Sequence, residues 1–408
     1  MQKVPIIIKE GAISMDLVSL VRASKYDKTT VRQALEKTLE NLGGIEKFIR
    51  PGMKVALKAN LVMKKKPEEA ATTHPVFVGE LARIIKNAGA EVLIIDSPGG
   101  PYTRSRLEDI YMGTGMKAVA EEIGAQLNFD TSEVEVENAE GKFIKRLKIL
   151  KPLVEADLVI NLPKLKTHGQ MVYTGAVKNM FGAIAGISKV EYHFNMKEYD
   201  RFADTLIDIF LSTKPALSIM DAIIGMEGAG PTAGVPKEIG VILASESAFS
   251  LDMAALNIID TDPKRVPLLK NSIERGLCPN SISKIKLIGE PIDSVKVKDF
   301  DVPALEGLKE IRFVENEFLK SLTGFILPKP VFLANKCIGC ADCVRSCPPN
   351  AIEMKNKKPE VKLSKCIRCF CCQELCPAKA IVIKRNKVID KLVKSAASAF
   401  MDIKGRIK

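Results

Sequence analysis

The chain has 408 residues and a net charge of +12, and its 46% hydrophobic and 27% charged residues are typical of a globular protein with two or three domains. Its apolar runs are all shorter than the roughly 18–20 residues that span a bilayer, and residues 1–11 lack the small-residue cleavage site of a signal peptide. The sequence therefore argues against a transmembrane segment, and we expect a soluble, cytoplasmic protein.

The first 330 residues alternate short apolar runs with longer amphipathic segments. The runs end in polar or glycine-rich turns, as strands do: 55–57, 92–95, 158–162, 217–220 and 239–243. Between them, apolar residues recur at helical spacing in 31–48, 76–88, 247–259 and 266–275. This alternation predicts an α/β domain with a largely parallel sheet. Residues 133–150 alternate differently and predict a local antiparallel hairpin.

Polar residues and glycines follow the predicted strands directly. In an open α/β sheet, ligands collect at the carboxyl ends of the strands. The residues in question are Lys58 and Asn60, then Asp96, Ser97, Gly99 and Gly100, then Lys164, Lys166, Thr167 and His168, and finally 225–234. Because lysine is prominent among them, we expect one cleft that binds a small anionic ligand such as a carboxylate or phosphate.

The densest of these stretches is 162–186. If Thr174 begins a helix, Lys178 lies one turn further on the same face. The alternative is a well-packed helix whose lysines are solvated. We select Lys166, His168 and Lys178 as candidate catalytic residues, with His168 as a proton donor. The candidate substrate-binding residues are Lys58, Asn60, Lys164, Thr174 and Asn179.

The chain has three histidines in all. We expect His74 to cap a helix and His193 to be structural. No phosphate-loop, dinucleotide-binding or nucleophile-elbow motif is present.

Cysteine is crowded into one short region. Nine of the ten cysteines lie between Cys337 and Cys376, and the other is Cys278, which we expect to be structural. A disulfide framework would spread along a small secreted chain. The crowding instead indicates a metal site in a reducing compartment.

The crowded region contains one motif twice, at an offset of 29 residues. The copies are Cys337-x2-Cys340-x2-Cys343-x3-Cys347-Pro348 and Cys366-x2-Cys369-x2-Cys372-x3-Cys376-Pro377. Three thiolates on one loop reach three irons of a cubane, and the fourth ligates the other cluster. We therefore expect two [4Fe–4S] clusters, cluster I on Cys337, Cys340, Cys343 and Cys376, and cluster II on Cys366, Cys369, Cys372 and Cys347. Zinc sites use cysteine pairs instead.

The duplicated motif resembles the bacterial two-cluster ferredoxins. That resemblance implies a small α+β iron–sulfur domain, which we place at 326–386, after an α/β domain at 1–325 and before a basic amphipathic helix at 387–408. Two residues depart from the repeat. Cys371 is a surplus thiol that we expect to be a bystander, and Arg368 stands where the first copy has Gly339.

Most of the positive charge lies in the C-terminal region. Residues 331–408 hold 17 Lys and Arg against 6 Asp and Glu, a net charge of +11, which leaves +1 for the rest of the chain. This excess is either a solvated surface or a docking face for an acidic redox partner protein. Nucleic acid is not expected as a partner, because no basic-aromatic recognition motif is present.

Several segments of the α/β region together resemble the domain of unknown function 362 family, some of whose members carry a C-terminal ferredoxin domain. They are 58–61, 73–75, 96–100, 162–169, 175–182 and 221–230. The resemblance implies no particular reaction. A fold-level likeness to the lactate racemase family, which uses a nickel pincer cofactor, is an analogy alone.

Three functions are compatible with these features. The first is an iron–sulfur oxidoreductase that relays electrons between an external carrier and an anionic ligand in the cleft. The second is a non-catalytic electron-transfer or cluster-delivery protein. The third is a non-redox, isomerase-like enzyme with structural clusters.

Overall fold

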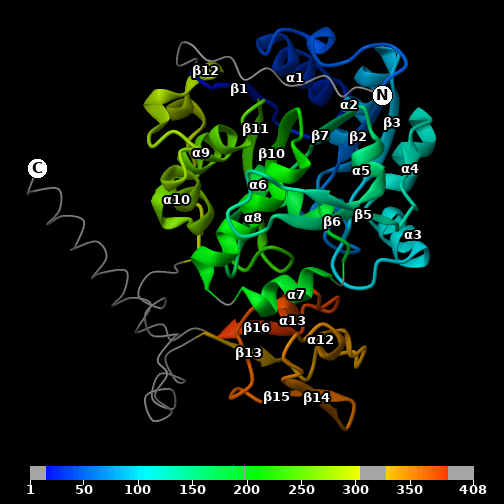
Figure 1. Ribbon diagram of the computed structural model, residues 1–408, viewed down its shortest axis with the longest axis vertical. Helices are drawn as coiled ribbons and strands as arrows, with labels where there is room; N and C mark the ends of the chain where they lie inside the picture. Colours follow the sequence, from blue (N-terminus) through cyan, green and yellow to red (C-terminus); the bar gives the residue numbers. More distant parts are fainter. Residues whose placement is uncertain (1–14, 187, 197, 304–327, 385–408) are drawn as a thin grey trace, which may run out of the picture.

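The computed structural model describes residues 15–186, 188–196, 198–303 and 328–384. These residues form a larger α/β domain, up to residue 303, and a small domain that lies below it in Figure 1. The predicted helix at 387–408 and the predicted domain boundary near 325 lie outside the described residues. Among the helices described, none has the length and apolar character needed to cross a membrane.

The larger domain is built on one mixed sheet. Its strand order is β12 (Lys286–Gly289), β1 (Leu17–Arg22), β11 (Val235–Ser245), β10 (Leu217–Glu227), β7 (Leu158–Asn161), β2 (Lys54–Lys58), β3 (Glu91–Ile95) and β4 (Gln126–Leu127). The pairs β12–β1, β10–β7, β7–β2, β2–β3 and β3–β4 are parallel, whereas β11 is antiparallel to both its neighbours. The predicted α/β class with a largely parallel sheet is confirmed.

Helices cover both faces of the sheet. Helices α1 (Lys28–Asn41), α2 (Pro75–Asn87), α3 (Arg104–Gly113) and α4 (Met116–Ile123) bury one face with Val55 and Leu57. Helices α6 (Ala176–Asn179), α8 (Tyr199–Thr213), α9 (Ala248–Ile258) and α10 (Pro267–Glu274) bury the other with Ala56. Successive strand residues point to opposite faces, so strands apolar at every position are buried on both sides.

Local residues explain where two of the predicted helices begin or end. The helix expected over 31–48 ends at Asn41, because Gly43 and Gly44 follow with φ angles of 105° and 89° that break helical geometry. Helix α2 begins at Pro75, and the side chain of His74 accepts a hydrogen bond from the Val76 amide at 3.3 Å, as expected for a cap. The predicted hairpin is also present, as β5 (Glu133–Glu137) paired with β6 (Arg146–Leu150).

The expected helix start at Thr174 is wrong. Thr174 ends β9 (Val172–Thr174), and α6 begins two residues later. The polar stretch before it is also a strand, β8 (Lys164–His168), which pairs in parallel with β10 and antiparallel with β9. All five β8 residues are buried although four of them are polar, so the segment lacks the apolar run that predicts a buried strand.

The small domain preserves the duplication seen in the sequence. Strand β13 (Lys329–Phe332) pairs with β16 (Ile381–Lys384), and β14 (Ile352–Lys355) pairs with β15 (Lys358–Val361). Helices α12 (Asp342–Arg345) and α13 (Cys371–Glu374) each follow a residue in left-handed conformation, Ala341 and Phe370, both with φ of 61°. Two copies of one loop and helix thus lie side by side around a small apolar core.

Candidate functional site

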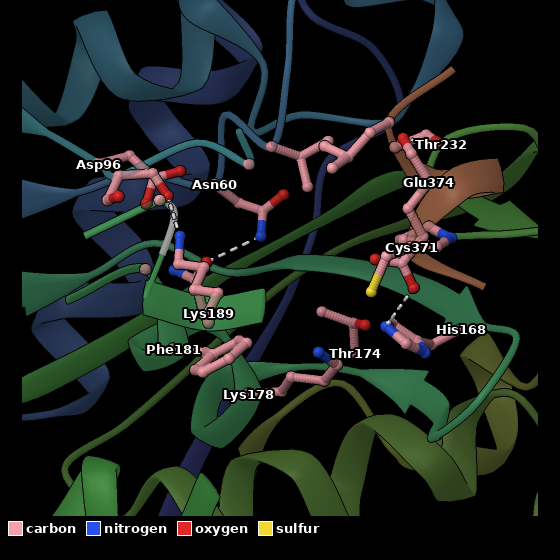
Figure 2. Close-up of a pocket in the computed structure, with 18 of the residues that line it drawn as sticks. Asn60, Asp96, His168, Thr174, Lys178, Phe181, Lys189, Thr232, Cys371 and Glu374 are labelled. Atoms are coloured by element: carbon pink, nitrogen blue, oxygen red, sulfur yellow. Dashed lines mark hydrogen bonds and ion pairs between the residues drawn. The ribbon is translucent and has the colours of Figure 1, made fainter. Parts of the chain in front are cut away.

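A cavity of about 110 Å³ lies where the two domains meet. Figure 2 shows its wall, to which the α/β domain contributes most of the residues and the small domain the rest, from helix α13 and the following Leu375. The sequence predicted that the turns after separate strands would converge. The cavity brings together Asn60, Asp96, Ser97, Gly99, Gly100, Lys166, His168, Thr174, Lys178, Asn179 and Thr232.

Lys166 is held in the cavity wall by neutral groups. Its Nζ donates hydrogen bonds to Asn60 Oδ1 at 2.7 Å and to the Ala71 carbonyl at 2.6 Å. Asn60 in turn donates to Asn179 Oδ1 at 2.8 Å, and Asn179 donates to Asn161 Oδ1 at 2.7 Å. No carboxylate of the described residues lies within ion-pair distance of Lys166. Burial, and then the charge of the nearby Lys178, lower the pKa of Lys166 to about 7.

Lys178 is the cavity-lining lysine with the fewest polar contacts to the described residues. It is 9% exposed and forms no hydrogen bond or ion pair with the described part of the chain. Its Nζ lies 5.5 Å from the ring centre of Phe181 and 5.9 Å from that of Phe202. Burial lowers its pKa. Glu374 is near enough to raise this pKa but forms no ion pair with Lys178. A buried ammonium group without a direct counter-charge attracts an anion, because burial of an unpaired charge is costly.

A third lysine enters from helix α7 (Ser188–Asn195). Lys189 donates a hydrogen bond to the Ser97 carbonyl, and burial lowers its pKa to about 7. His193 lies one turn further along α7 and also lines the cavity, with its ring packed against Phe181 and Phe202. Their spacing of four residues places them on one helix face, a signal that the sequence already contained.

Lys58 and Lys164 stand behind the cavity wall rather than on it. Lys58 Nζ lies 2.7 Å from Asp96 Oδ1, and Lys164 Nζ lies 2.9 Å from Asp221 Oδ2. Both lysines are essentially without solvent exposure, and neither is among the described residues that line the cavity. These two predicted substrate-binding lysines are therefore already neutralised by carboxylates in the fold.

His168 has a fixed tautomer. Its Nδ1 accepts hydrogen bonds from the backbone amides of Gln170 and Met171, both at 3.1 Å. Burial, and then the charge of Lys178, hold the pKa of His168 well below its ordinary value, so the ring is neutral. With Nδ1 accepting, the single proton sits on Nε2, which lies 3.1 Å from Glu374 Oε1 (Figure 2).

Glu374 belongs to α13, so this contact joins the domains. Three further contacts hold α13 and its surroundings in place: Thr232 Oγ1 donates to the Glu374 carbonyl at 2.9 Å, Gln373 Nε2 to the Ala229 carbonyl at 3.1 Å, and Lys379 pairs with Glu69 at 2.8 Å. Gly99 also lies close to the small domain, because a Cβ at this position would meet the end of the Leu375 side chain. That Cys371, Glu374 and Leu375 line the cavity was not predictable from the sequence, because no local pattern specifies how two domains dock.

The cysteines of the small domain separate into two groups. A small second cavity is lined by Cys337, Cys340, Cys343 and Cys376 together. Burial raises the pKa of Cys343 to about 11, with contributions from the three other thiols of this group. The pKa of Cys347 is raised by burial and by Cys369 and Cys366, which belong to the other group.

This grouping fits two cubanes with exchanged fourth ligands. Equivalent amides donate to the two sulfurs that are predicted to be exchanged: Ala351 N to Cys347 Sγ and Ala380 N to Cys376 Sγ, both at 3.2 Å. No group of three or more His, Cys, Asp or Glu in the described ranges could hold a single metal ion. Cubane thiolates bind separate irons and are consequently spaced more widely than the ligands of one ion.

Comparison with known proteins agrees with the two-part architecture. Residues 55–257 match the domain of unknown function DUF362, and residues 329–377 match a 4Fe-4S dicluster domain. The protein is thus an α/β protein with an iron–sulfur dicluster domain. It belongs to the DUF362 family.

A relative covers most of the chain. The thylakoid-associated protein sll1697 of Synechocystis is 31% identical over 303 residues, which span 72% of this chain and 91% of the relative. Two solved structures are more distant. The lactate racemase apoprotein of Thermoanaerobacterium thermosaccharolyticum has a TM-score of 0.37 at 14% identity, over 57% of this chain and 54% of its own, so the match spans about half of that racemase. A Thermotoga maritima protein has a TM-score of 0.33 at 12% identity, over 63% of this chain and 61% of its own.

Proposed function

We propose that the protein transfers electrons between two [4Fe–4S] clusters and a small anionic ligand in the interdomain cavity. One observation carries this proposal: the four-residue helix α13 holds a predicted cluster II ligand, Cys372, and two cavity-lining residues, Cys371 and Glu374. A ligand in the cavity would therefore lie against the helix that binds cluster II.

The residues of the cavity suit a reduction or oxidation of an anion. When bound, the clusters would supply one electron each at low potential. Lys166 and Lys178 would neutralise the ligand, and the Nε2 proton of His168 faces Glu374 at the cavity wall. A 2-oxo acid or an enoate that gains two electrons also takes up two protons, so a proton-bearing group beside cluster II is expected in such a site.

The proposal is tested by reoxidation of the reduced protein. The protein is purified anaerobically, reduced with dithionite, freed of excess reductant and mixed with small 2-oxo acids, enoates and inorganic oxyanions. We expect at least one compound to restore the cluster absorbance near 400 nm faster than buffer does. Lys166→Met should slow this reaction about 10-fold or more, because it removes a buried charge from the ligand site.

The control is an oxidant that needs no binding site. Ferricenium should reoxidise the wild type and the Lys166→Met variant at the same rate. If no compound in the panel reoxidises the clusters faster than buffer, or if the variant reacts as fast as the wild type, the proposal is wrong. Transfer of the clusters to an apo-ferredoxin would then favour a delivery protein.

A further inference from the structure

The cavity carries an excess of positive charge. Among the described residues that line it, three are lysines, Lys166, Lys178 and Lys189, and two are acids, Asp96 and Glu374. Asp96 is already neutralised by Lys58, which lies behind the wall. When a bound anion holds all three lysines in the protonated form, they exceed the one remaining carboxylate by two positive charges.

Hydrogen-bond donors without partners lie in the same wall. The hydroxyl groups of Thr174 and Ser97 are buried, and within the described part of the chain neither has a partner. The Lys178 ammonium adds further free donors. Buried polar groups in native proteins are almost always satisfied, so unsatisfied ones that face a cavity indicate a ligand with acceptor oxygens.

The size of the cavity restricts that ligand. A volume of about 110 Å³ is several-fold below the roughly 300–1,000 Å³ of pockets that hold drug-sized molecules. The enclosed part of the cavity therefore suits a ligand of a few non-hydrogen atoms better than a whole nucleotide or flavin. The face of Phe181 provides apolar wall for a short carbon skeleton.

Building on the proposed function, we infer that the cavity binds a small dianion, either a short dicarboxylate or a phosphate group. Two negative charges would balance the excess of the wall, whereas a monocarboxylate would leave one ammonium group buried without a counter-charge. Lys178 and Thr174 contact one anionic oxygen group, and Lys166 and Lys189 balance the remaining charge.

The test is calorimetric titration of the oxidised, cluster-loaded protein under anaerobic conditions. The probes are malonate, inorganic phosphate at pH 8, acetate as a monoanion and malonamide as a neutral analogue. We expect at least one dianion to bind roughly 10-fold or more tightly than acetate, and malonamide not to bind. Tighter binding of malonate would identify the ligand as a dicarboxylate, and tighter binding of phosphate would identify it as a phosphate group.

Two variants locate the site. Lys178→Met should weaken dianion binding roughly 10- to 100-fold, the usual worth of hydrogen bonds to charged groups. Thr174→Val keeps the shape and should weaken it less. Lys37→Met, in an exposed pair with Glu40 on α1, is the matched control and should bind normally. Circular dichroism and iron content show whether each variant folds.

Acetate binding as tightly as both dianions would overturn the inference, and so would unchanged dianion affinity in a folded Lys178→Met or Thr174→Val variant. The titration uses oxidised clusters and needs no electron transfer. A negative titration therefore does not contradict the proposed electron transfer. A negative reoxidation experiment likewise does not contradict dianion binding.

Discussion

A chain that carries Cys347→Ala with Cys369→Ala is expected to keep one intact cubane, with about four irons. Both residues belong to the predicted cluster II, so cluster I retains all four thiolates. A chain that carries Cys347→Ala with Cys340→Ala should keep no intact cubane, although both changes lie in one motif, because each cluster then loses a thiolate. Three-iron clusters or loss of iron are the expected products.

Iron and sulfide analysis with EPR, before and after dithionite reduction, distinguishes the two pairs. The first variant should show the signal of a single reduced [4Fe–4S] cluster, without the coupling seen when two clusters are reduced together. Cys371→Ala is the control and should keep about eight irons, since this thiol is outside both ligand sets. If the same-motif pair keeps an intact cubane and the first pair does not, each motif holds its own cluster and the exchanged ligation is wrong.

Asp96→Ala is expected to lower the free energy of unfolding of the α/β domain by about 3–5 kcal/mol. The Asp96 carboxylate lies 2.7 Å from Lys58 Nζ and also accepts a hydrogen bond from the Leu61 amide at 2.7 Å. Lys58 has no solvent exposure, so its ammonium would be left buried without a counter-charge. Removal of one partner of a buried ion pair lowers the free energy of unfolding far more than replacement of both partners by apolar residues does.

Urea unfolding followed by far-UV circular dichroism measures this loss. Glu40→Gln, which breaks the exposed Lys37–Glu40 pair, should change the free energy by less than about 1 kcal/mol. The double variant Lys58→Met with Asp96→Asn should be more stable than Asp96→Ala, because it leaves no buried charge unpaired. A loss below about 1 kcal/mol for Asp96→Ala would show that the buried ion pair does not hold this part of the sheet together.

The strands around the cavity show which parts of the fold are predictable from the sequence. Strands β2, β3 and β7 were predicted within a few residues, because each is apolar on both faces and ends at a polar turn. Strand β8 was missed, since its Lys164, Lys166 and His168 are polar residues that long-range contacts bury. The register of β8 on β10, with Lys164 opposite Asp221, follows from pairing between distant segments that no local pattern encodes.

The amino-acid sequence by itself determined the iron–sulfur domain and the set of turns that form the cavity. Cluster ligation is a local constraint: the thiolates of one loop must reach neighbouring irons, so their spacing is visible in the chain. The tertiary structure alone decided which lysines remain available to a ligand. Lys58 and Lys164 meet carboxylates 38 and 57 residues away in sequence, whereas Lys178 meets none among the described residues. The position of α13 likewise depends on contacts between the two domains. The tertiary structure therefore places Glu374 in the cavity wall, whereas the residues around it in sequence do not predict this.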